Sequence, residues 1–182
     1  MIYVFLATGF EETEAVTSID LLRRCDKEVI TVGIGDNLIT SVHGVTLVTD
    51  ITDNEIILDN NLEMIILPGG MPGTLNLEKS KSVQDAIEYC KANNIYIAAI
   101  CAAPSILGHK GLLKGKKATC FEGFEHQLLG AEVCSAAAVA DGKIITGRSV
   151  GCAVQFGLLL VETLISKEKR DHLEKSLLCS KN

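Results

Sequence analysis

Five short apolar segments recur along the chain, each with the length of a β-strand. They are continuous rather than alternating, which is typical of strands buried on both faces of a parallel sheet. The segments are IYVFLA at 2–7, EVITVGI at 28–34, LEMIILP at 62–68, IYIAAI at 95–100 and KIITGR at 143–148. This pattern predicts a central, mostly parallel sheet.

Between these segments the apolar positions follow the 3.6-residue period of helices. In 80–92 they fall on one face, and Ser82 and Asp85 have the spacing of a capping box. The segment 11–25 has three acids in its first turn, where the helix dipole favours negative charge. The segment 152–165 is apolar on most sides. Alternating strands and helices predict a three-layer α/β/α domain with helices on both faces of the sheet.

In a sheet of this kind the functional groups lie at the carboxyl ends of the strands, where the loops enter the helices. Three of these ends carry reactive or glycine-rich sequences. They are TGFEETE after the first strand, LPGGMPG after the third and ICAAPS after the fourth. We expect the three loops to meet at one site.

Composition and charge limit the number of domains, the partners and the cellular compartment of the protein. The 182 residues and 47% hydrophobic content fit one domain over 1–182, with 167–182 as a polar tail or short helix packed on it. A net charge of -6 argues against nucleic acid as a partner. The N-terminal apolar run is too short for a signal peptide or a membrane span, so we expect a cytoplasmic protein that does not bind membranes.

The seven cysteines are odd in number and lack the spacing of disulfide frameworks or metal sites, which favours free thiols in a reducing compartment. Cys101 differs from the others because it sits at an abrupt strand-to-helix turn, the geometry of a nucleophile elbow. The alternative is a buried cysteine that packs as a small apolar residue. That second interpretation is the better one for the five thiols at Cys25, Cys90, Cys120, Cys134 and Cys152, and Cys179 lies in the tail.

A thiol at such a position needs partners that shift its pKa. We expect the amides at the start of the helix near Ala103 to lower the pKa of Cys101, and Gly69 and Gly70 to bring further amides close. The same amides are suited to an oxyanion, although PGG is equally typical of a tight turn. Glu11, Glu12 and Glu14 are all candidate acids. An ionised glutamate would raise the thiol pKa, whereas a protonated one would lower it.

The motifs GFEETEAV, ILPGG, AAICAAP, DGKIITGR and GLLLVETLI, in this order, resemble the DJ-1/ThiJ/PfpI superfamily over residues 2–166, and most closely its DJ-1 (ThiJ) deglycase branch. The resemblance implies a flavodoxin-like sandwich, related to class I glutamine amidotransferases, and a homodimer. It implies that Cys101 is the nucleophile, that Glu14 is the protonated acid touching it, and that the amides of Gly70 and Ala102 form the oxyanion site.

Phe121, His126 and Arg148 are candidates for lining the site. Three positions nevertheless depart from the family pattern. Phe121 stands where some members have a histidine, so a Cys–His dyad is not expected, and His126 is more typical of a surface histidine. The residues after Arg148 are SVG where the family has GPG. Ala102 stands where the peptidase branch has histidine, which argues against a peptidase.

Three functions follow for Cys101. The first is a glyoxalase-like or deglycase-like enzyme acting on reactive dicarbonyls such as methylglyoxal, or on their adducts with thiols and amines, in stress protection. The second is a redox sensor or stress chaperone with an oxidisable thiol. The third is an intracellular amidase or peptidase. We expect no metal, because Glu122 and His126, although one helical turn apart, are better explained as a solvent-exposed pair. We also expect no cofactor, because the glycines do not match a dinucleotide-binding fingerprint.

Overall fold

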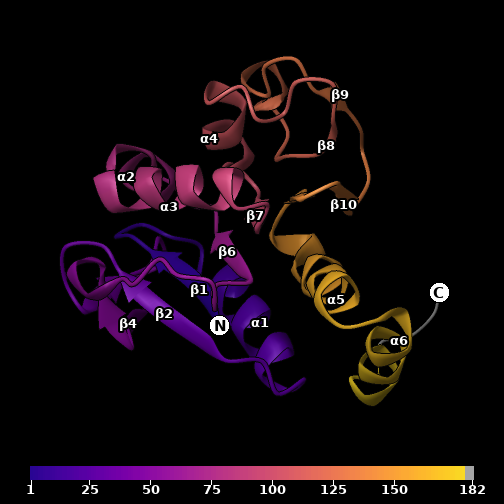
Figure 1. Ribbon diagram of the computed structural model, residues 1–182, viewed down its shortest axis with the longest axis horizontal. Helices are drawn as coiled ribbons and strands as arrows, with labels where there is room; N and C mark the ends of the chain where they lie inside the picture. The colour runs from indigo at the N-terminus through magenta and orange to yellow at the C-terminus, as the bar shows by residue number, and fades with distance from the viewer. Residues whose placement is uncertain (179–182) are drawn as a thin grey trace.

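The computed structural model describes residues 1–178 and contains a seven-stranded sheet (Figure 1). The strand order is β10-β11-β7-β6-β1-β2-β5, and every neighbouring pair is parallel except β10 with β11. The strands are β1 Ile2–Leu6, β2 Val29–Gly33, β5 Ile51–Thr52, β6 Met64–Leu67, β7 Tyr96–Ile100, β10 Ala138–Asp141 and β11 Ile144–Gly147. The five predicted strands and the mostly parallel sheet are confirmed.

Helices cover both faces of the sheet, as the sequence predicts. They are α1 Glu12–Arg23, α2 Gly73–Lys79, α3 Lys81–Ala92, α4 Pro104–His109, α5 Ala153–Leu164 and α6 Lys167–Ser176. Side chains alternate along β1, so Tyr3 and Phe5 pack with α2, α3 and α4, whereas Val4 and Leu6 pack with α1, α5 and α6. The fold is therefore the expected three-layer, flavodoxin-like sandwich (Figure 1).

The start of α3 differs from the predicted capping box. Ser80 is the N-cap, and its side chain accepts a hydrogen bond from the amide of Val83. Ser82 instead donates to Asp53 at 2.7 Å, and Asp85 pairs with Lys81 on the helix surface. The predicted capping box is wrong because α3 begins at Lys81. Ser82 is therefore an early residue of the helix and not its N-cap.

Several short elements escape the sequence pattern. The strands β3 Leu38–Thr40 and β4 Thr46–Val48 form an antiparallel hairpin, and β8 Lys117–Ala118 pairs with β9 Glu132–Val133. Three 3₁₀ turns lie at Asp53–Glu55 (η1), Glu125–Gln127 (η2) and Val150–Cys152 (η3). Elements of two or three residues are too short to show a period.

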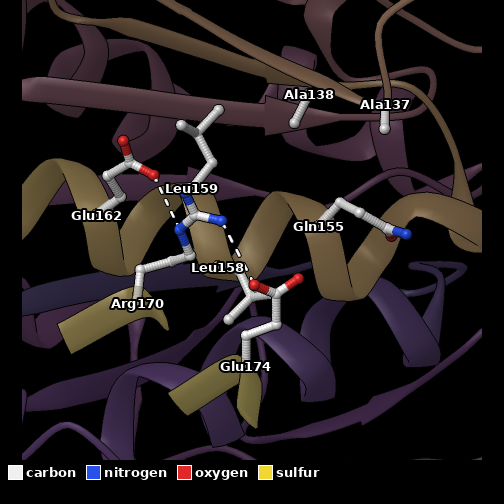
Figure 2. Close-up of a pocket in the computed structure, with 8 residues that line it drawn as sticks. All are labelled: Ala137, Ala138, Gln155, Leu158, Leu159, Glu162, Arg170 and Glu174. Carbon is white, nitrogen blue, oxygen red and sulfur yellow. Dashed lines mark hydrogen bonds and ion pairs between the residues drawn. The ribbon is translucent and has the colours of Figure 1, made fainter. Parts of the chain in front are cut away.

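The predicted tail helix is present as α6 and packs against α5. Leu173 of α6 is buried in the core cluster, and Leu177, just after α6, is half-buried against it. Arg170 of α6 lies between Glu162 of α5 and Glu174 of α6, at 3.1 Å and 3.5 Å (Figure 2). Two leucines and one bridging cation thus fasten α6 to the domain. Residues 179–182, with Cys179, lie outside the described part. Over residues 1–178 we find no helix with the length and apolar character needed to cross a membrane.

Candidate functional site

Cys101 follows β7 directly and adopts a left-handed backbone conformation, with φ of 66°. A residue with a side chain pays about 1–2 kcal/mol for this conformation, so the surrounding structure has to hold it. The amide of Cys101 donates to the carbonyl of Gly147 at 3.0 Å, and its carbonyl accepts from the amide of Phe121 at 2.8 Å. The strained elbow expected from the sequence is present, and its half-buried thiol lies at the carboxyl edge of the sheet.

Glu14 reaches this elbow from the first turn of α1. The side chain of Glu11 caps the helix by accepting from the Glu14 amide at 2.7 Å, and this geometry turns Glu14 inward. Glu14 is only 1% exposed, and its Oε2 accepts from the amide of Gly69 at 2.9 Å. The amide of Glu11 donates in turn to the carbonyl of Gly69. The loops after β1, β6 and β7 therefore meet at one site.

Gly69 and Gly70 permit this close approach. A Cβ on Gly69 would lie 2.6 Å from the Cβ of Cys101 and 2.8 Å from Oε2 of Glu14. Gly70 has φ of 90°, and a Cβ there would lie 2.5 Å from the amide nitrogen of Glu11. The glycine turn is therefore part of the site and not only a chain reversal.

The backbone amides divide between the acid and the thiol. Gly70 and Ala102 direct their amides to the Cys101 sulfur, as the resemblance implies for an anion at this position. Gly69, which we grouped with them from the sequence, donates to Glu14 instead. The candidate oxyanion donors are thus Gly70 and Ala102, and Gly69 orients the acid.

The pKa values of Glu14 and Cys101 are both raised. Burial raises the pKa of Glu14 to about 7, although the Gly69 amide and the Cys101 thiol oppose the rise. Burial also raises the pKa of Cys101 to about 12, helped by the Glu14 charge and opposed by the amides of Ala102 and Gly70. The sequence led us to expect a lowered thiol pKa, and desolvation reverses that direction. Around neutral pH the thiol therefore keeps its proton, and Glu14 is the group that gains or loses one.

Comparison with known proteins places this chain in a family. The sequence profile of the DJ-1/PfpI family matches residues 1–163. The chain belongs to the DJ-1/PfpI family. It is 33% identical to protein dj-1beta of Drosophila melanogaster, over 98% of this chain and 97% of that protein. The resemblance seen in the sequence is confirmed.

Two further relatives are similar along most of the chain. Protein DJ-1 homolog A of Arabidopsis thaliana is 36% identical over 97% of this chain, which spans 46% of that relative. A structure of Toxoplasma gondii DJ-1, described as oxidized, superimposes with a TM-score of 0.90 at 31% identity, over 99% of this chain and 98% of that chain. The chain thus spans less than half the length of the Arabidopsis relative.

Three residues predicted near the site of this DJ-1/PfpI chain lie around it with different roles. Phe121 holds the elbow through its backbone, while its side chain is exposed. His126 lies on the 3₁₀ turn η2 and is exposed. Arg148 is exposed too, donates to the carbonyl of Ser135 at 3.3 Å, and its charge acts on the Cys120 thiol. Neither His126 nor Arg148 has a recorded contact with Cys101 in the described chain.

The remaining described cysteines fit the packing interpretation to different degrees. Cys25, Cys90 and Cys120 are buried, whereas Cys134 and Cys152 are only partly covered, and all are free thiols. Burial raises the pKa of Cys90 to about 12 and that of Cys120 to about 11. Cys101 is distinguished from them by its acid partner and its strained backbone.

A group of possible metal ligands, which no local sequence motif indicates, lies beside the first loop. One ligand atom each from Glu11, Glu12 and His43 lies within 4.8 Å of the others, and Glu12 contacts Nδ1 of His43 at 2.9 Å. Glu11 also serves as the helix cap, so its carboxylate is already engaged. The separation of 31 residues between Glu12 and His43 hides this group from any local motif.

Proposed function

We propose that the protein is a cysteine-dependent enzyme of stress protection that converts reactive dicarbonyls such as methylglyoxal, or their early adducts with thiols and amines, to hydroxy acids. The observation that supports this most is the pairing of the Cys101 thiol with a buried carboxyl, Glu14, whose pKa is raised to about 7. An acid with a pKa near the working pH both accepts and returns protons efficiently.

The first step joins the sulfur to the aldehyde carbon. The Glu14 carboxylate accepts the thiol proton as Cys101 attacks, and it then protonates the new alkoxide oxygen, which leaves a hemithioacetal. The amides of Gly70 and Ala102 are positioned by the elbow to stabilise the negative oxygen beside the sulfur. The thiol with a pKa of about 12 therefore needs a base at hand, and Glu14 is that base.

The second step moves one proton between two adjacent carbons. Glu14 removes the proton from the carbon bound to sulfur, which gives an enediolate, and returns it to the neighbouring carbon. The hydroxyl proton passes from the first oxygen to the second, so the carbon bound to sulfur becomes the carbonyl of a thioester and its neighbour carries the hydroxyl. Water then hydrolyses the thioester, which releases lactate when methylglyoxal is the substrate and restores the thiol. The net reaction adds one water molecule and needs no oxidant, reductant or cofactor.

Lactate formation from methylglyoxal tests this proposal without added glutathione. We expect Cys101→Ala to abolish turnover and Glu14→Gln to lower kcat about 10²-fold to 10⁴-fold, because a glutamine cannot carry the proton. Cys134→Ala is the matched control, since it removes a partly covered thiol that has no acid partner. Turnover by Cys101→Ala at the wild-type rate would refute the proposal.

Redox sensing by the same thiol is a second candidate. Cys101 is half-buried, and the two amides directed at its sulfur are suited to the oxygens of a sulfinate. The similar Toxoplasma gondii DJ-1 structure is described as oxidized. Peptide mass spectrometry after graded peroxide should find Cys101 oxidised before Cys90 and Cys134, because the Glu14 carboxylate beside Cys101 can accept the thiol proton as the sulfur reacts. Equal oxidation of the three thiols would remove this candidate.

A peptidase or amidase finds less support in the geometry. Such an enzyme needs a group that protonates a leaving amine, and histidine usually supplies it. His43 pairs with Glu12, His109 pairs with Glu78, and His126 is exposed. The only acid–base partner recorded for Cys101 in the described chain is Glu14.

We also propose that the protein is a cytoplasmic homodimer. Exposed valines on α1 and on the hairpin beside it offer apolar surface that a second copy would cover: Val16 of α1, Val42 and Val45 of the hairpin loop, and Val48 of β4. The hairpin loop touches α1 through Val42, whose amide donates to Phe10, and through His43 and Glu12. The free thiols suit a reducing compartment. Light scattering on the purified protein measures the oligomeric state.

A further inference from the structure

We propose that the protein has a second binding site, for a small carboxylate with an apolar body, at the opposite end of the sheet from Cys101. The site is a cavity of about 320 Å³, here called the lysine pocket. Its lining includes Lys91, Lys116 and Lys143 together with Ile95, Ile97 and Leu112. Ile95 precedes β7 and Cys101 follows it, so about 20 Å separates the two sites.

The wall of the lysine pocket is continuous with the hydrophobic core. Ile97 is almost fully buried, and Ile95 and Leu112 pack against the same core cluster. At about 30 Å³ for each water-sized group, 320 Å³ holds about ten non-hydrogen atoms. The cavity therefore suits a short alkyl or aryl body and lies near the lower limit of small-molecule sites.

All three charged residues that line the lysine pocket are lysines, although the chain has 23 acidic and only 17 basic residues. Two of them form long ion pairs: Glu88 lies 3.8 Å from Lys91, and Asp141 lies 3.6 Å from Lys116, which also donates to the Asp141 carbonyl at 3.4 Å. The Lys143 ammonium lies 3.7 Å from the centre of the Tyr96 ring. Such loosely paired cations beside an apolar wall complement an amphipathic anion.

The backbone of the lysine pocket favours a carboxylate over a phosphate. Phosphate sites commonly use a run of backbone amides or a helix N-terminus. The pocket instead meets the C-terminal end of α3 at Lys91, where the helix carbonyls oppose a doubly charged anion more than a singly charged one, and it contains one glycine, Gly142. Ammonium groups alone provide the charge, and they suit a singly charged head group.

Octanoate, which has ten non-hydrogen atoms, is the probe that we would titrate into the intact protein. Calorimetry should detect binding at least tenfold tighter than that of acetate, which lacks the body, or octanol, which lacks the charge. Methyl NMR signals of Ile95, Ile97 and Ile144 should shift on titration, because these side chains line the cavity.

Variants then test the charge contribution. Lys91→Gln and Lys116→Gln should each weaken octanoate binding about threefold to fivefold, as expected for partly exposed ion pairs. Lys114→Gln is the matched control, since Lys114 is exposed in the same basic segment but does not line the pocket. Equal weakening by Lys114→Gln, octanol binding as tight as octanoate, unshifted isoleucine methyls or absent binding would each overturn the proposal. Lactate formation at Cys101 is measured separately, so failure of one site leaves the other intact.

Discussion

The raised pKa of Glu14 makes the stability of the protein depend on pH in a direction that can be measured. Glu14 has an ordinary pKa of 4.5 when unfolded and about 7 when folded, so the folded protein holds a proton that the unfolded chain has lost between these values. The stabilising contribution is therefore complete below pH 4.5 and is lost as pH rises through 7. At about 1.4 kcal/mol per pH unit, the loss amounts to about 3 kcal/mol.

Urea unfolding of wild type and Glu14→Gln between pH 5 and 7.5 isolates this contribution, since titrations common to both proteins cancel in the difference. We expect the free energy of unfolding of Glu14→Gln to rise relative to wild type by up to about 3 kcal/mol across this window. Glutamine keeps an acceptor for the Gly69 amide, so the comparison changes the proton and little else.

Glu55→Gln is the control, because the pKa of Glu55 is shifted in the opposite direction. Hydrogen bonds from the amide and the hydroxyl of Thr52 lower the pKa of Glu55, so its contribution is already complete above its unfolded pKa. The difference between Glu55→Gln and wild type should stay flat from pH 5 to 7.5. A flat profile for Glu14→Gln as well would mean that Glu14 titrates normally, and the raised pKa on which the proposed acid–base role rests would have to be abandoned.

Three further outcomes test other parts of the structure. Cys101→Gly should be about 1 kcal/mol more stable than Cys101→Ala in urea, because glycine adopts the left-handed elbow without strain; equal stabilities would contradict the strain argument. Leu173→Ala should lower the free energy of unfolding by about 2–3 kcal/mol, and a change near zero would show that α6 does not add to the core. Val48→Lys should halve the mass seen by light scattering while leaving monomer stability within about 0.5 kcal/mol, whereas an unchanged mass would place any dimer contact elsewhere.

The central part of the fold was accessible from the sequence because its strands are long and continuously apolar. The run at 95–100 corresponds to β7 within one residue, and the apolar face of 80–92 matches the buried face of α3. The strand order was not derivable in the same way, because it depends on how the helices cross the sheet. The edge strands β5 and β10 were missed for a local reason: β5 has two residues, and β10 is only partly buried.

The candidate site was predictable in its position but not in its electrostatics. Three loops with reactive or glycine-rich sequences follow neighbouring strands of the predicted sheet. Their position at the strand ends was enough to indicate Cys101 and the glycine turn. The choice of Glu14 came from the family resemblance, because periodicity treats Glu11, Glu12 and Glu14 alike. The structure separates them, since Glu11 caps the helix, Glu12 contacts His43 and Glu14 is buried. Desolvation depends on the whole fold, which is why the direction of the thiol pKa was wrong.

The position of Gly69 between the acid and the thiol has a consequence for changing this site by design. Its amide binds Glu14, its carbonyl accepts from Glu11, and the space for a Cβ is filled by Cys101 and Glu14. The gap between carboxyl and sulfur is thus set by main chain and not by rotatable side chains. Exchanging Glu14 would alter the chemistry of the acid at a fixed separation, whereas altering the separation would require a different loop between β6 and α2.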